Sequence, residues 1–112
     1  MSAAFENGCI EMMKGSHKLG RINHVFVGKQ YCADPERIEV AAERMDVVPC
    51  ELEAGDAVFF HFNTLHRSSA NRSDKRRWAL ITVFNALKNV PIKGRPHSEH
   101  IPVDKVDDSM LI

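Results

Sequence analysis

The pattern of apolar and polar positions predicts short strands along this chain. Residues 9–13, 24–27 and 47–52 are brief runs rich in apolar side chains, and turn residues such as Asn7-Gly8 and Gly28 bound them. Runs of this length between turn signals are typical of β-strands. Pro49 gives the third run an edge or irregular position, because proline cannot donate to a ladder. The first half of the chain is therefore predicted to be mainly β.

One short helix interrupts these strands. Asp34 can cap a helix, Pro35 suits its first position and Glu36 complements the helix dipole. An apolar stripe at helical spacing follows, formed by Ile38, Ala41, Ala42 and Met45. We predict a helix over residues 35–44 that packs against a sheet.

Two further strands are predicted in the stretch from Glu53 to Ala86. Residues 57–62 are almost wholly apolar, which is typical of a strand covered on both faces, and residues 77–86 are rich in aromatic and β-branched side chains. A polar loop over residues 67–76 separates the two runs. Alternation places Arg77 on an apolar face of the second strand. An unpaired buried charge is costly, so Arg77 needs an anion that either the chain or a ligand supplies.

Composition narrows the class of protein. The chain has 112 residues, 44% of them hydrophobic and 27% charged, with a formal net charge of zero. These values fit one domain and argue against a general nucleic-acid or anionic-membrane binder. Three cysteines without CxxC spacing favour a reducing compartment, and no run has the roughly 20 apolar residues of a membrane span. We expect a soluble, cytoplasmic chain.

Several motifs resemble those of one enzyme family. The stretch GDAVFFHFNTLHRSSANRSDKRRWALITVFN, together with ENGCI at residues 6–10 and GSHKLG at residues 15–20, resembles the C-terminal core of the phytanoyl-CoA dioxygenase family. The family comprises iron(II)- and 2-oxoglutarate-dependent oxygenases on a double-stranded β-helix, or jelly roll. The resemblance implies one partial domain over residues 1–112, the C-terminal part of a jelly roll, with a core at about 6–87 and an extended tail at 88–112.

The resemblance also implies roles for three residues. His66 matches the family's last iron ligand, and Arg77, eleven residues later, matches the arginine that binds the 2-oxoglutarate co-substrate. Ser68 matches a serine that assists this arginine. The family's other two ligands form a His-x-Asp pair before the Asn-Gly segment, where only residues 1–5 stand here. We therefore expect the first two iron ligands to be absent and the chain to be inactive alone.

Structural explanations are also open for the histidines and for the basic residues of the loop. His66 itself could be a structural, hydrogen-bonded histidine. His61 could line a pocket, while structural roles suit His17 and His24. The segment His97-Ser98-Glu99-His100 contains a His-x-Glu, but it follows His66 and lies between prolines. The basic residues of the loop form either a solvated turn or a patch for a phosphate-bearing substrate: Arg67, Arg72, Lys75 and Arg76.

Two functional hypotheses remain. The first is the C-terminal portion of an iron(II)/2-oxoglutarate-dependent hydroxylase acting on a small molecule. The second is a non-catalytic jelly-roll binding module with a vestigial pocket. In either case the predicted strands leave apolar side chains such as Phe60, Phe62 and Trp78 partly uncovered, so we expect self-association through β faces.

Overall fold

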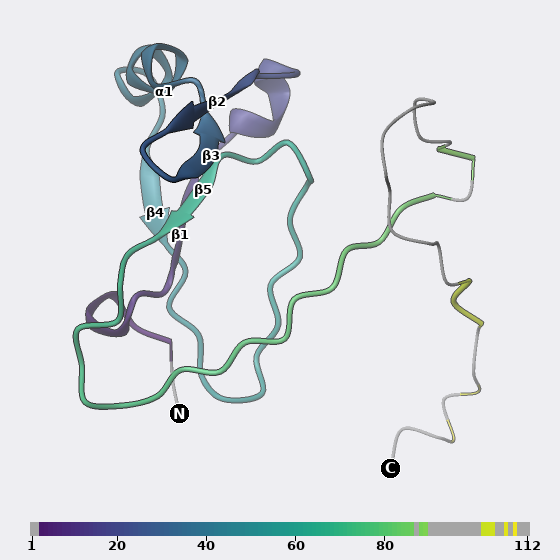
Figure 1. Cartoon of the computed structure of the whole chain (residues 1–112). Coiled ribbons are helices and arrows are strands. Elements are labelled where there is room, and N and C mark those ends of the chain that lie inside the picture. The colour runs from purple at the N-terminus through teal and green to yellow at the C-terminus, as the bar shows by residue number, and fades with distance from the viewer. Residues whose placement is uncertain (1–2, 87, 90–101, 105–106, 108, 110–112) are drawn as a thin grey trace. The chain divides into compact units, whose positions relative to one another are not determined.

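The computed structural model describes residues 3–86, 88–89, 102–104, 107 and 109. The chain divides into two compact units, Met1–Ala79 and Leu80–Ile112. All named helices and strands fall in the first unit (Figure 1). In chain order they are the 3₁₀ turn η1 (Phe5–Asn7), β1 (Ile10–Met13), the 3₁₀ turn η2 (Ser16–Leu19), β2 (His24–Val27), β3 (Gln30–Ala33), α1 (Pro35–Ala42), β4 (Val47–Pro49) and β5 (His66–Ser68).

The main sheet has three antiparallel strands in the order β4-β1-β5. The central strand β1 places Met12 opposite Val48 of β4 and opposite His66 of β5. Side chains alternate along β1, so Glu11 and Met13 are buried while Ile10 and Met12 are half-buried on the other face. The first strand of the chain therefore organises the segment that carries His66.

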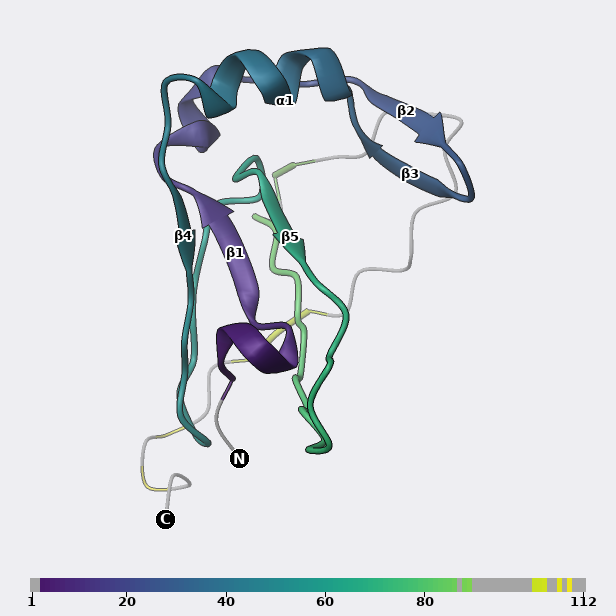
Figure 2. The ribbon, with the colours of Figure 1, turned by 90° about the vertical axis from the view of Figure 1, so that its left-hand side faces the viewer.

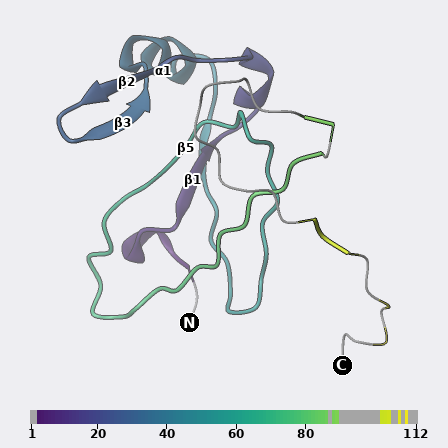
Figure 3. The same cartoon turned by 45° about the vertical axis from the view of Figure 1, so that its right-hand side comes forward.

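The helix and a hairpin lie beyond one end of this sheet (Figures 2 and 3). Helix α1 begins as predicted, because the Asp34 carboxylate accepts the main-chain N–H of Glu36 at 3.1 Å and Pro35 occupies the first turn. It ends at Ala42, two residues before the predicted limit. Strands β2 and β3 form the hairpin, with Gly28 in the left-handed region at its turn. The sequence did not predict β3.

The buried side chains cluster around β1. Among the described residues, the buried hydrophobic side chains are Cys9, Met13 and Ala41, and the buried polar ones are Asn7, Glu11 and Ser16. Five of these six precede residue 17. The first unit is thus held together by β1 and its flanking turns rather than by a large apolar core.

Two strand predictions are wrong. Residues 57–62 and 77–86 have no strand structure, and a strand forms instead at His66–Ser68, inside and just before the predicted loop. The apolar runs are not covered: Phe59, Phe62 and Trp78 are 87%, 82% and 87% exposed. β propensity reflects packing against a neighbouring strand, and no described strand pairs with either run.

The coarse fold class is confirmed, since the described residues are mainly β with one short helix. They form two small sheets and no closed barrel, so the jelly roll stays a prediction. In the second unit, the Asn85 and Asn89 side chains bond each other at 2.8 Å across a turn. The segment His97–His100 and most of the predicted tail lie outside the described residues. No helix in the described part of the chain is long and apolar enough to cross a bilayer.

Candidate functional site

His66 and Ser68 lie on the same face of β5. They alternate with Arg67, which faces Glu11 on the buried side of the sheet. His66 is opposite Met12 and Ser68 is opposite Ile10, and both site residues are exposed. The sheet therefore brings together an imidazole and a hydroxyl over an apolar strand, at an open surface.

The His66 imidazole has a defined orientation. Its Nδ1 lies 2.8 Å from the main-chain O of Thr64. A carbonyl oxygen only accepts, so Nδ1 carries the proton and, in the neutral ring, the lone pair resides on Nε2. The Phe60 ring meets the His66 ring edge-on, with 5.2 Å between centroids. A metal-binding histidine commonly donates its other ring N–H to a carbonyl in this way, so His66 fits a metal ligand.

A complete metal site does not form from the described residues. No group of three or more His, Cys, Asp or Glu side chains converges among them. His17 and His61 contact each other, with 5.7 Å between ring centroids, but His61 accepts the N–H of Asn63 through Nδ1. Its Nε2 then carries the proton in the neutral ring and is not a ligand. Among the described residues, no second metal-binding side chain therefore joins His66.

Arg77 is half-buried and is bound to the main chain of a residue before β1. Its Nε donates to the carbonyl O of Asn7 at 3.2 Å. No carboxylate of the described residues forms an ion pair with Arg77. Because Arg77 is half-buried rather than enclosed in an apolar interior, its predicted need for an anion stays a prediction. The two terminal nitrogens of its guanidinium form a planar fork that can hold a carboxylate bidentately. Strand alternation is not what orients Arg77, because no strand forms there.

The buried face of the sheet carries an ion pair that the sequence analysis missed. Arg67 donates to Glu11 through Nε at 3.0 Å and through Nη2 at 3.3 Å. The Glu11 side chain is only 8% exposed. A carboxylate within the apolar run of residues 9–13 was the available signal, because a buried carboxylate requires a partner that donates hydrogen bonds to it. That partner, Arg67, is itself 72% exposed.

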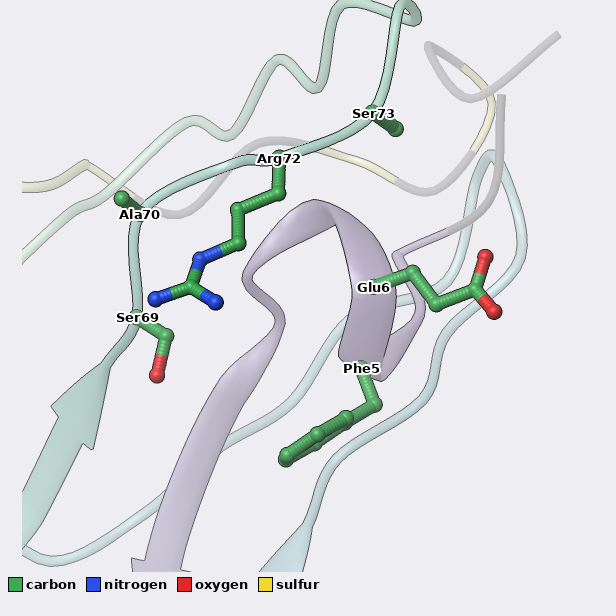
Figure 4. A pocket seen from close by; sticks show the side chains of 6 residues that line it. All are labelled: Phe5, Glu6, Ser69, Ala70, Arg72 and Ser73. Carbon is green, nitrogen blue, oxygen red and sulfur yellow. The ribbon is translucent and has the colours of Figure 1, made fainter.

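A pocket of about 520 Å³ lies beyond the end of β5 (Figure 4). The Arg72 guanidinium points toward Ser69, whereas the Glu6 carboxylate points away from it. The main-chain N–H of Arg72 donates to the Glu6 carbonyl at 3.3 Å, which joins the loop to η1. The residues that line the pocket are Phe5, Glu6, Ser69, Ala70, Arg72 and Ser73. None of His66, Ser68 and Arg77 lines this pocket.

Residues 2–79 match the family described as phytanoyl-CoA dioxygenase (PhyH). The chain belongs to the phytanoyl-CoA dioxygenase family. The match includes β1, β5, His66, Ser68 and Arg77, so the resemblance on which the three roles rest is confirmed at the level of the family. The individual roles stay predictions.

Similar proteins are dioxygenases and hydroxylases. The L-proline trans-4-hydroxylase of Streptomyces griseoviridis is 29% identical over 88% of this chain and 46% of its own length. The methylphosphonate hydroxylase of Gimesia maris is 31% identical over 77% of this chain and 30% of its own. The ectoine dioxygenase of Bordetella parapertussis is 35% identical over 61% of this chain and 23% of its own length. The chain thus spans less than half the length of these relatives. No solved structure matches it.

Proposed function

We propose that this chain forms the C-terminal part of the active site of an iron(II)- and 2-oxoglutarate-dependent dioxygenase. His66 would supply one imidazole to the iron, and Arg77, assisted by Ser68, would bind the far carboxylate of 2-oxoglutarate. The orientation of His66 carries the proposal, because Nδ1 is bound to Thr64 and Nε2 is the atom available to a metal. Iron(II) with bound 2-oxoglutarate would activate dioxygen to hydroxylate the substrate.

The chain carries only part of the proposed iron site. No His-x-Asp occurs among the 112 residues. Such iron sites use two histidines and one carboxylate, and the described residues would contribute only one imidazole to this set. We infer that the chain alone binds iron(II) weakly and is inactive by itself. The related enzymes are named for L-proline, methylphosphonate and ectoine, so we propose a small-molecule substrate.

The alternative is a non-catalytic binding module. The pocket at Arg72 favours this alternative, since none of the proposed site residues His66, Ser68 and Arg77 lines it. For either function we propose a cytoplasmic setting, because Cys9, Cys32 and Cys50 are all free thiols.

Anaerobic titration with iron(II), with and without 2-oxoglutarate, tests the proposal. The 112-residue chain should show no stoichiometric binding, because a single imidazole does not hold a labile divalent ion against water. The reading frame extended upstream to include any His-x-Asp should bind one equivalent and form succinate, and His66→Ala should abolish both. Tight binding by the 112-residue chain would implicate another carboxylate, with Glu99 the first to replace. Activity that survives His66→Ala in the extended protein would refute the assignment.

A further inference from the structure

The Ser16 hydroxyl connects two segments that are far apart in the sequence. Ser16 is 1% exposed. Its Oγ donates to the carbonyl O of Met13 at 2.7 Å and accepts the main-chain N–H of Leu65 at 2.8 Å. Ser16 follows Gly15, whose φ of 82° is in the left-handed region and turns the chain back after β1. The hydroxyl thus binds the turn after β1 to the residue that precedes β5.

The bond to Leu65 acts on the peptide group that also contacts His66. The N–H of Leu65 and the C=O of Thr64 belong to one planar unit and point to opposite sides of it. Ser16 holds the N–H side, and the Thr64 carbonyl on the other side accepts Nδ1–H of His66 at 2.8 Å. The next peptide is held too, because Met13 N–H donates to the Leu65 carbonyl at 2.9 Å.

We propose that Ser16 is a positioning residue for His66. By fixing the Thr64–Leu65 peptide plane, its hydroxyl keeps the Thr64 carbonyl at Nδ1 and so selects the ring tautomer whose lone pair is on Nε2. The value of this tautomer for iron binding rests on the function proposed above. The link from Ser16 to the tautomer rests only on the hydrogen bonds of the chain.

The test reads the tautomer of His66 directly, without metal. The chain is labelled with ¹⁵N-histidine and studied at about pH 8.5, where imidazoles are neutral. Ring nitrogen shifts distinguish the two tautomers, and magic-angle-spinning spectra report them in associated as well as monomeric protein. His66→Asn identifies the His66 signals. The wild-type chain should show a protonated Nδ1 at His66.

Ser16→Ala should lower the ratio of Nδ1–H to Nε2–H at His66 by about fivefold, the effect of losing one typical hydrogen bond. Ser16→Cys keeps the size of the side chain but is a weak acceptor, so it should shift the ratio in the same direction. Ser16→Thr keeps the hydroxyl and should retain the wild-type tautomer. Ser69→Ala is the matched control, since the Ser69 hydroxyl makes no hydrogen bond within the described residues.

An unchanged tautomer in folded Ser16→Ala and Ser16→Cys would overturn the inference. So would global unfolding of the Ala, Cys and Thr variants alike, since the role of Ser16 would then be that of a general fold residue. A failure of the proposed function looks different. The tautomer would still respond to Ser16, while iron binding by the extended protein would not depend on His66.

Discussion

Glu11 of β1 lies opposite Arg67 of β5, and the two side chains form a bidentate ion pair on the face of the sheet where Glu11 is buried. The pair matches the register of the two strands, in which Glu11 lies opposite Arg67. A slip of one residue would place Arg67 on the open face and turn His66 and Ser68 inward. The ion pair is therefore consistent with the register that leaves His66 and Ser68 exposed on the other face.

The two partners should respond unequally to mutation. Arg67→Met leaves the Glu11 carboxylate, 8% exposed, without its counter-ion and should lower the free energy of unfolding by about 1–3 kcal/mol. Glu11→Gln removes the buried charge and frees an arginine that is 72% exposed, so its effect should be smaller. Urea denaturation compares them, with Arg72→Met as the control for an exposed arginine outside this pair. An equal or larger loss in Glu11→Gln would contradict this account of the pair.

Gly8 should tolerate no side chain. Its φ is 75°, and a Cβ there would overlap the carbonyl oxygen of Ser69. Gly28 has a φ of 61°, but a Cβ added there would meet no atom within 4 Å, so it is the matched control. Gly28→Ala should cost only the left-handed strain, about 1–2 kcal/mol, and Gly8→Ala clearly more. Thermal unfolding of both variants measures the difference. Equal losses would show that the approach to Ser69 relaxes at little cost.

Cys9 should be the slowest of the three thiols to react. Burial raises the pKa of Cys9, and the charges of Glu51 and Glu11 raise it further, whereas Arg77 acts in the opposite direction. The reactive thiolate of Cys9 therefore forms only at a pH above the usual range of a thiol. At about pH 8, alkylation followed by mass spectrometry should show Cys9 reacting more slowly than half-buried Cys32. Equal rates would mean that the turn around Cys9 opens readily.

The isolated chain should self-associate through its uncovered apolar side chains. Phe59, Phe62 and Trp78 are more than four-fifths exposed, and residues 57–62 have no described strand beside them. Apolar segments with unpaired main-chain groups are templates for pairing with another chain. Sedimentation velocity should show oligomers that decrease in Phe59→Lys and Phe62→Lys, but not in the control Tyr31→Lys on the separate hairpin. A monomeric wild-type chain with cooperative unfolding would argue against this.

The sequence predicted those elements whose signals are local. The helix start at Asp34 and the strands β1, β2 and β4 depend on neighbouring residues, and the structure confirms them, although β4 ends at Pro49 and not at residue 52 as predicted. Strand β5 was missed because His66–Ser68 is polar and forms a strand only by pairing with β1. Residues 57–62 show the converse, since strong β propensity forms no strand without a partner.

The candidate site likewise has features that the sequence showed and features that it did not show. The spacing of His66, Ser68 and Arg77 was visible in the sequence, and the family match covers it. The contacts that orient them were not visible. Ser16 reaches Leu65 across 49 residues and Arg77 reaches Asn7 across 70, and both bonds end on main-chain groups. A main-chain group has no side-chain signature, so no sequence pattern identifies it.

In a protein that carries the complete iron site, Arg77 should bind the 2-oxoglutarate co-substrate. Arg77→Lys keeps the charge but loses the planar fork, so 2-oxoglutarate affinity should fall by about 1.5–3 kcal/mol, roughly ten- to hundredfold. The bond from Nε to Asn7 is also lost, so a small drop in melting temperature, within the effect of one hydrogen bond, is expected. The neighbouring exposed Arg76→Lys is the control and should change neither quantity.

The measurement is the apparent constant for 2-oxoglutarate from succinate formation, beside the melting temperature of each variant. A raised constant with a nearly unchanged melting temperature assigns Arg77 to the co-substrate. A large drop in melting temperature with unchanged co-substrate affinity would assign it to the fold instead. Its bond to Asn7 would then be its whole function, because that bond holds the residues before β1 against the segment that follows the loop.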